Sequence, residues 1–320
     1  MACDLPTECA LCPRACGANR AAGERGVCGA DDRLVVARAA LHFWEEPPIS
    51  GERGSGAVFF SNCPLHCVYC QNAVIAAGDA GREVGVERLA EMCRELEAQG
   101  ALNLNFVTPT HYAPQIRAAI ERARAAGCAL PTVWNTSGYE TVEAVRDNVG
   151  FVDVYLTDFK YASAELGARY SHAANYPEVA LAALEAMVSE AGAPVFDEVD
   201  GAPRLVRGVV VRHLMLPGQL ADSMRVVRLV HERFGGDVLL SLMNQYTPVV
   251  AQTARSGAGP AQRHAAATLA RCPELAGRVP DEDYERLLDY ADLIGVEDYF
   301  WQEGGAAEES FIPPFDLTGV

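Results

Sequence analysis

Three closely spaced cysteines constrain this chain more than any other feature. Cys63, Cys67 and Cys70 follow the spacing C-x3-C-x2-C directly after an apolar run. This spacing supplies three thiolates, whereas a [4Fe-4S] cube has four irons, so one iron would lack a protein ligand and could bind a substrate or cofactor. A structural zinc loop is the alternative, but it requires a fourth ligand, and the next cysteine, Cys93, lies in a helical pattern. The loop therefore predicts chemistry at a metal cluster.

The composition indicates a cytosolic enzyme. The chain has 320 residues, half of them apolar, which is enough for one large core with small appendages. Its formal net charge of −17 repels a phosphate backbone, so nucleic acid is not expected as a partner. Eleven cysteines, an odd number with metal-ligand spacings, argue against a secreted disulfide scaffold. We find neither a secretory signal nor a membrane-spanning apolar run, and therefore predict a cytoplasmic protein without membrane contact.

Short apolar runs alternate with amphipathic helical patterns along most of the chain. Leu89, Met92, Cys93 and Leu96, for example, recur at helical spacing. Six βα units of this kind predict an α/β fold, a parallel sheet curled into a partial (β/α)6 barrel that is two strands short of a closed TIM-like barrel. The predicted strands are 57–61, 102–107, 132–135, 151–157, 205–216 and 238–243.

The barrel divides the chain into three predicted parts. Residues 1–54 form a cysteine-rich segment with a hairpin, residues 55–250 form the barrel, and residues 251–320 form a helical extension with an irregular tail. The extension contains predicted helices over 262–271 and 281–293. Barrels of this type carry their chemistry at the carboxyl ends of the strands, where the Cys63 loop is also expected.

A second group of cysteines lies near the N-terminus. Cys9, Cys12, Cys16 and Cys28 are four ligands, enough to complete either a zinc tetrahedron or an auxiliary iron–sulfur cluster. The segment around them has almost no core of its own, so we expect a metal to stabilise it. The Cys-Pro pair favours an iron–sulfur cluster and the compact glycine loop favours zinc, so both metals stay open.

The C-x3-C-x2-C loop, with the aromatic Tyr69 before its last cysteine, resembles the signature of the radical S-adenosylmethionine superfamily. That resemblance implies that the free iron chelates S-adenosylmethionine and that one electron cleaves it to methionine and a 5′-deoxyadenosyl radical. Further motifs resemble the activating-enzyme-like group related to pyruvate formate-lyase activating enzyme, in which the radical abstracts a hydrogen from a glycine of a partner enzyme. These motifs span nearly the whole chain: 42–51, 54–56, 70–72, 105–112, 135–138, 155–160, 216–218 and 241–248.

The same resemblance implies a set of cofactor contacts. The superfamily usually has a Gly-Gly-Glu turn after the second strand, where this chain has Thr108 and Thr110, whose oxygens can still meet the methionine amine. Arg212 matches an arginine that pairs with the methionine carboxylate. Three residues match positions beside that carboxylate around a cation, although an aspartate is usual at the first: Asn135, Thr136 and Asp158. Tyr69 and Ser137 complete the predicted pocket.

Lys160 is the one lysine in a chain that has 25 arginines. It follows Asp158 by two residues at the end of the fourth predicted strand, and strand alternation places both side chains on one face. A site that needs a compact ammonium or a titratable amine would resist exchange of lysine for arginine. We therefore predict that Lys160 and Asp158 are catalytic; the alternative is a lysine left by chance on a solvated loop.

Five further polar residues lie in or near motif loops. His111 and His42 are predicted proton donors or substrate contacts. His66, within the cluster loop, could influence the potential of the cluster, and Glu45 and Glu46 could face the substrate through a glycine-rich hairpin. The alternative for each of the five is an ordinary hydrogen-bonded or solvated loop residue.

These features together predict a radical S-adenosylmethionine enzyme whose [4Fe-4S] cluster is bound by Cys63, Cys67 and Cys70. Two activities stay open within this class: activation of a glycyl-radical enzyme, or radical modification of another peptide or a small metabolite. A non-catalytic electron-transfer or zinc-binding protein is the alternative from a different class. The expected partners are an electron donor such as flavodoxin or ferredoxin, and a protein, peptide or small-molecule substrate.

Overall fold

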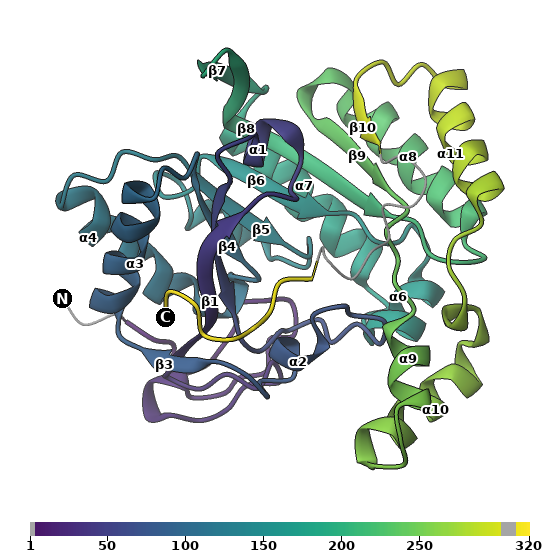
Figure 1. The fold of residues 1–320 in the computed structure, drawn as a ribbon, viewed down its shortest axis with the longest axis horizontal. Helices are drawn as coiled ribbons and strands as arrows, with labels where there is room; N and C mark the ends of the chain where they lie inside the picture. Colours follow the sequence, from purple (N-terminus) through teal and green to yellow (C-terminus); the bar gives the residue numbers. More distant parts are fainter. Residues whose placement is uncertain (1–3, 302–311) are drawn as a thin grey trace.

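The centre of the molecule is a ten-stranded, mostly parallel sheet (Figure 1), seen in a computed structural model that describes residues 4–301 and 312–320. Six neighbouring strands run parallel in chain order. These are the six predicted strands, with boundaries shifted by a few residues, so the predicted partial (β/α)6 barrel is confirmed. They are β2 (Ser55–Phe60), β4 (Leu104–Val107), β5 (Thr132–Thr136), β6 (Val154–Asp158), β8 (Ala202–Leu214) and β9 (Leu239–Met243).

Alternation along these strands separates an outer face from an inner face. Outward side chains such as Phe60, Phe106 and Trp134 are buried in one large core that includes the covering helices. The inner face is apolar early in a strand and polar late, because Val133 is followed by Asn135 and Val210 by Arg212. The strand ends that the sequence singles out therefore point into the concave side of the barrel.

Helices cover the outer face and form the C-terminal extension (Figure 1). The predicted apolar positions of α3, such as Leu89 and Leu96, are buried. No helix in the described part of the chain is long and apolar enough to span a membrane. The helices are α1 (Pro47–Ser50), α2 (Ala73–Ala76), α3 (Val86–Ala98), α4 (Ala113–Ala125), α5 (Val142–Arg146), α6 (Ala164–Ser171), α7 (Tyr176–Ala191), α8 (Leu220–Phe234), α9 (Val249–Arg255), α10 (Pro260–Arg271) and α11 (Asp281–Leu293).

Four strands lie outside the predicted set. β1 (Leu34–His42) is antiparallel to β2 and also pairs with β3 (Arg82–Val84). β7 (Val195–Val199) forms a hairpin with the first half of β8 and extends beyond the sheet in Figure 1, while β10 (Tyr299–Trp301) pairs with β9. β7 is mostly exposed, so its sequence has no buried apolar pattern from which a strand could be predicted.

The segment after β1 closes the amino end of the barrel. Because β1 is antiparallel to β2, its last residue, His42, lies opposite Ser55 at the start of β2. The short helix α1 follows, and its fully buried Ile49 packs against inner-face residues that include Val133, Leu156 and Val210. The predicted hairpin therefore does not approach the cluster loop, which lies at the opposite, carboxyl end of β2.

Residues 312–320 run along the edge of β1 and cross it in Figure 1. The backbone N–H of Ala39 donates to the Thr318 carbonyl at 2.9 Å, and Arg38 forms an ion pair with Asp316 at 2.9 Å. Phe315 packs on Phe59 of the inner face, with ring centroids 5.7 Å apart. The tail thus covers the β1 side of the partial barrel; Phe311, at the start of the predicted irregular tail, lies outside the described residues.

Candidate radical S-adenosylmethionine site

The three predicted cluster ligands lie on one loop at the carboxyl end of β2. Two residues of this loop, Asn62 (φ 72°) and His66 (φ 54°), adopt the left-handed conformation that tight turns require. The backbone N–H of Leu65 donates to the Cys63 sulfur at 3.5 Å. Cys63, Cys67 and Cys70 are all free thiols.

Burial affects the ionisation of two of these thiols. Burial first, and the neighbouring Cys67 second, raise the pKa of Cys63 to about 11 and that of Cys70 to about 12. Three thiolates cannot share such a site without a compensating cation, and cluster irons supply one. No three His, Cys, Asp or Glu side chains in the described residues are arranged to hold a metal ion as they stand.

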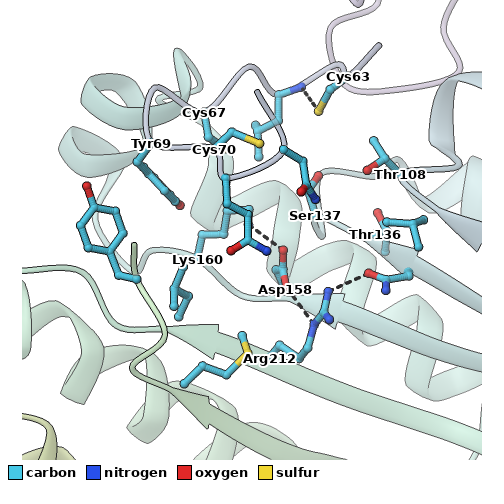
Figure 2. Close-up of a pocket in the computed structure, with 18 of the residues that line it drawn as sticks. Cys63, Cys67, Tyr69, Cys70, Thr108, Thr136, Ser137, Asp158, Lys160 and Arg212 are labelled. Carbon is cyan, nitrogen blue, oxygen red and sulfur yellow. Dashed lines mark hydrogen bonds and ion pairs between the residues drawn. The ribbon is translucent and has the colours of Figure 1, made fainter. Parts of the chain in front are cut away.

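A pocket separates the cluster loop from the carboxyl ends of the barrel strands (Figure 2). In the figure the cysteines lie along one side, and Asp158 and Arg212 lie on the opposite side. The residues after β9, Gln245 to Thr247, complete the lining. The structure brings together most of the predicted site residues in this lining: Cys63, Cys67, Cys70, Tyr69, Thr108, Asn135, Thr136, Ser137, Asp158, Lys160 and Arg212.

Asp158 is the centre of a charge network in the pocket. Its Oδ2 accepts a hydrogen bond from Lys160 Nζ at 2.6 Å, and its Oδ1 accepts one from Arg212 Nε at 3.2 Å. Burial would raise the pKa of Asp158, but Lys160 and Arg212 outweigh it and bring the pKa below its usual value. The carboxylate is therefore ionised at neutral pH.

Lys160 is held in its charged form. Burial would lower its pKa, but Asp158 and Cys67 outweigh burial, so the pKa lies above the usual value. The predicted proximity of Lys160 and Asp158 is confirmed by their ion pair, although β6 ends at Asp158 and Lys160 lies two residues beyond it. Of the two possibilities that the sequence left open for Lys160, a compact ammonium and a titratable amine, this network favours the ammonium.

Glu45 reaches the same network from the amino end of the barrel. Its Oε2 accepts from Arg212 Nη1 at 3.1 Å, and its Oε1 accepts from the amides of Asn105 and Asn135. The neighbouring Glu46 is also buried, which raises its pKa. The prediction that these carboxylates face the substrate from a loop is therefore wrong, because neither lines the pocket. Glu45 is bonded to internal groups, and Glu46 is buried with its Oε2 unpaired.

Arg212 has a protein partner on each nitrogen. Besides Asp158 and Glu45, its Nη2 donates to Asn135 Oδ1 at 2.7 Å. A planar guanidinium held in this way is well oriented. To pair with a carboxylate of a bound ligand, as the resemblance implies, Arg212 would share or exchange one of these partners.

The two threonines predicted to contact the cofactor both lie in the turn after β4, but only one of them lines the pocket. Thr108 lines the pocket with φ 59°, a conformation that is unusual for a β-branched residue and that occurs here where the superfamily has glycine. Thr110 is buried outside the lining, and its hydroxyl donates to Glu140 at 2.6 Å. The predicted cofactor contact of Thr110 is therefore corrected to an internal one.

Glu140 is a buried residue that the sequence analysis did not select. One oxygen, Oε1, accepts from the hydroxyls of Thr110 and Thr136, both at 2.6 Å, and from the Trp134 indole at 3.3 Å. Burial raises its pKa to about 6, although these three donors act in the opposite direction. Glu140 thereby fixes two turns that border the pocket, and no local pattern distinguishes it from a surface glutamate.

The three histidines of the motif loops lie outside the pocket lining. His111 is fully buried, its Nε2 contacts the Ser61 carbonyl at 2.9 Å, and burial lowers its pKa to about 3. Burial likewise lowers the pKa of His42 to about 4. His66 Nε2 contacts the Val27 carbonyl at 3.1 Å. A catalytic role for His111 is therefore corrected to a structural one, because it is neutral and enclosed by protein.

The residues of the pocket match the chemistry of an iron–sulfur cluster with a zwitterionic ligand. Three thiols and no fourth line one side, while cationic, anionic and amide groups line the other. Asn72, which also lines the pocket, has a buried Oδ1 with no hydrogen-bond partner. Such an acceptor can satisfy an ammonium or amino group of a ligand. Fold and site together define an α/β barrel whose pocket places a loop with three thiols opposite a charged network, a lining suited to a cluster with one iron free of protein ligands.

Comparison with known proteins identifies the family. The profile of the Radical SAM superfamily matches residues 57–230, more than half of the chain. The chain therefore belongs to the radical SAM superfamily, and this membership implies a [4Fe-4S] cluster and S-adenosylmethionine as its cofactors.

Two individual proteins resemble the chain. The uncharacterized protein MJ0674 of Methanocaldococcus jannaschii is 27% identical over 252 residues, which cover 75% of this chain and 66% of MJ0674. The structure of Streptococcus suis SuiB bound to the precursor peptide SuiA is similar with a TM-score of 0.48 and 11% identity, covering 76% of this chain and 47% of SuiB. The chain thus spans just under two thirds of MJ0674 and about half of SuiB.

Proposed function

We propose that this protein is an S-adenosylmethionine-cleaving enzyme whose 5′-deoxyadenosyl radical abstracts a hydrogen from a substrate. When bound, the cluster supplies the electron that cleaves S-adenosylmethionine and so provides the 5′-deoxyadenosyl radical. The observation that carries the proposal is the pocket itself, in which a three-thiol loop faces the ionised network of Asp158, Lys160 and Arg212.

In this proposal the chain's own residues bind and orient. Cys63, Cys67 and Cys70, which line the pocket, would hold three irons of the cluster and leave the fourth without a protein ligand. Asn135, Thr136 and Ser137 offer amide, hydroxyl and backbone groups to the methionine part of the cofactor, together with the Thr108 turn. Tyr69 packs under the loop. Lys160 and Arg212, each only 15% exposed, provide positive charge that would stabilise the carboxylate of the cofactor.

The first substrate candidate is the backbone glycine of a glycyl-radical enzyme. Support comes from the activating-enzyme-like motifs around Asn135 and Lys160. Another peptide or a small metabolite is the second candidate. A deuterated candidate substrate distinguishes them, because the deuterium appears in 5′-deoxyadenosine only when that substrate is the hydrogen source.

The decisive test is anaerobic reconstitution with iron and sulfide, followed by incubation with S-adenosylmethionine and dithionite. We expect a brown protein that forms 5′-deoxyadenosine, whereas a variant with alanine at Cys63, Cys67 and Cys70 does neither. A non-catalytic electron carrier would bind a cluster without forming 5′-deoxyadenosine. Retained cleavage in the triple variant would refute the assignment.

We further propose that Cys9, Cys12, Cys16 and Cys28 bind a second metal centre, either zinc or an iron–sulfur cluster. The sulfurs of Cys16 and Cys28 both approach Gly26, where an added Cβ would lie 3.3 and 3.4 Å from them. All four thiols are free, and Cys9, Cys12 and Cys28 are buried. A glycine at this point therefore leaves room for two sulfurs to converge.

Arg20 supports a negatively charged centre at this place. Its side chain is completely buried, and its hydrogen bonds go to the carbonyl oxygens of Asp31 and His111. Within residues 4–301 and 312–320 it has no carboxylate partner. A buried cation without an anion is costly, and a metal held by four thiolates carries a net negative charge that offsets it.

Metal analysis of the purified protein tests this second centre. We expect zinc, or iron in excess of one [4Fe-4S] cluster. Replacing all four N-terminal cysteines by alanine should lower metal content and stability and leave the spectrum of the Cys63 cluster. Unchanged metal content and unchanged stability in that variant would rule the centre out.

We also propose a cytoplasmic setting with flavodoxin or ferredoxin as the electron donor. The support is indirect: many reduced thiols and a reaction that begins with one electron. Reduced flavodoxin should replace dithionite in the 5′-deoxyadenosine assay. No cleavage with either carrier, under conditions in which dithionite works, would exclude this class of donor.

A further inference from the structure

Cys67 receives a hydrogen bond from outside the cluster loop. The donor is the hydroxyl of Ser171, the last residue of α6, whose Oγ lies 3.1 Å from the Cys67 sulfur. Ser171 is completely buried. Because a sulfur bound to iron has no proton to give, the Ser171 hydroxyl must be the donor once the cluster is present.

Two tyrosines extend this contact into a buried row of hydroxyl groups. The Tyr161 hydroxyl lies 2.8 Å from Ser171 Oγ and 2.8 Å from the Tyr69 hydroxyl. Both tyrosines are buried, and Tyr161 packs against Tyr170 and Tyr176. Ser171 therefore cannot turn to water, and Tyr161 holds its oxygen in place. Because Ser171 gives its one proton to Cys67, the Tyr161 hydroxyl is the donor to Ser171 Oγ, and this donor polarises Ser171 and strengthens its bond to the sulfur.

The end of α6 is fixed to the cluster loop by further contacts. Arg14 of the N-terminal segment donates through Nη2 to the Ser171 carbonyl and through Nε to the Pro64 carbonyl, both at 2.9 Å. The backbone N–H of Val68 donates to the Tyr170 carbonyl at 2.8 Å. These bonds flank the Ser171–Cys67 contact on both sides, so the hydroxyl and the sulfur are fixed relative to each other.

We propose that Ser171 is a positioning residue that sets the reduction potential of the [4Fe-4S] cluster through its hydrogen bond to Cys67. A hydrogen bond to a ligand sulfur stabilises the more negative, reduced cluster and so raises the potential. The inference rests on the proposed function, because it requires the cluster. It adds a residue from α6, about one hundred positions away in sequence from the cluster loop.

The test is a redox titration of the reconstituted holoenzyme, followed by electron paramagnetic resonance of the reduced cluster. Ser171→Ala should lower the equilibrium constant for reduction about tenfold, which corresponds to a shift of roughly −59 mV for one electron. Ser171→Thr, which keeps the hydroxyl, should remain near wild type. Ser163→Ala is the matched control, because Ser163 caps the other end of α6 by accepting from Leu166 N and does not contact the cluster loop.

The outcomes separate this inference from the proposed function. A wild-type protein with no cluster signal refutes the proposed function before any variant is measured. A normal wild-type signal with the same potential in Ser171→Ala and Ser163→Ala overturns the role of Ser171. If Ser171→Ala cannot be loaded with iron, Tyr161→Phe decides. It should lower the equilibrium constant about threefold, roughly 28 mV at 59 mV per tenfold, and an unchanged potential overturns the inference.

Discussion

Replacing Lys160 by methionine would leave the Asp158 carboxylate with one charged partner instead of two. The ammonium lies 2.6 Å from Asp158 Oδ2, and the two side chains are only 15% and 17% exposed. A hydrogen bond between charged groups contributes about 1.5–3 kcal/mol when water cannot replace it. We therefore expect Lys160→Met to lower the free energy of unfolding by about 2 kcal/mol at neutral pH.

The pH dependence of this effect follows from Asp158. The folded protein holds the pKa of Asp158 below its usual value, so the stabilisation is present at neutral pH and is lost as the pH falls and the carboxylate takes up a proton. The difference between wild type and Lys160→Met should therefore shrink in acid. Urea unfolding under anaerobic conditions at two pH values measures it.

A second substitution separates charge from shape. Lys160→Arg keeps the positive charge, so most of the stability should return, but a broad guanidinium cannot replace a point contact of this length. We expect 5′-deoxyadenosine formation to fall about tenfold, equivalent to about 1.4 kcal/mol of transition-state stabilisation, with normal cluster content. The matched control is Arg233→Met, which also removes a cation close to a carboxylate, 2.7 Å from Glu185, but where both side chains are exposed, 59% and 41%.

The control substitution should lower the free energy of unfolding by less than about 1 kcal/mol and leave turnover unchanged, because exposed ion pairs contribute little. Equal stability of Lys160→Met and wild type would refute the reasoning about the buried network. If Lys160→Arg matched wild type in both stability and turnover, the solitary lysine would be a remnant of composition, and Arg212 would become the stronger basic candidate.

Three further predictions concern the surroundings of the pocket. In the folded protein the pKa of Glu140 is raised from 4.5 to about 6, so the free energy of unfolding of the wild type should fall by about 2 kcal/mol as the pH rises through this interval. Glu140→Gln should abolish this pH dependence. Urea unfolding at pH values on either side of the interval measures it. Glu45→Ala should destabilise the protein by about 3 kcal/mol because it leaves Arg212 without its inner partner. In a double-mutant cycle with Arg212→Met, the combined loss should differ from the sum of the two single losses by at least about 1 kcal/mol. Full additivity would show that the two side chains do not interact. Phe315→Ala should loosen the tail from Phe59, so the Ala39 amide, which donates to Thr318, should exchange its hydrogen faster than in the wild type, and an unchanged rate would show that the tail is held by its backbone alone.

The six barrel strands could be predicted because parallel strands are buried on both faces and appear as short apolar runs. β2, from Ser55 to Phe60, is buried at every position. Of the four strands that were not predicted, β3 and β10 are the outermost strands of the sheet and β7 pairs only with β8. β1 is largely buried, but its residues do not form an uninterrupted apolar run. β1 carries a charged Arg38 among small apolar residues, and β7 is a mostly exposed arm.

The site residues differ in the same way: those identified by a few neighbouring residues were predicted, and those defined by distant contacts were not. Spacing identified the Cys63 loop, and alternation placed Asp158 and Lys160 on one face, because both signals are contained within a few residues. Glu45 was assigned to the wrong surroundings because its partner Arg212 is 167 residues away. Ser171 and Glu140 were not predicted at all, since a buried serine and a buried glutamate are defined by their three-dimensional neighbours and not by adjacent sequence.

The pairing of β1 with the tail has a consequence for how the chain is made. Arg38 and Asp316 are 278 residues apart, so β1 can meet this partner only after all the residues between them have been synthesised. The cysteines of the cluster loop emerge long before Ser171, Lys160 and Arg212, the residues that surround their sulfurs and complete the pocket. Contacts of such long range form slowly. We therefore expect the pocket beside the cluster loop to be completed only late in folding, after the six parallel strands have paired.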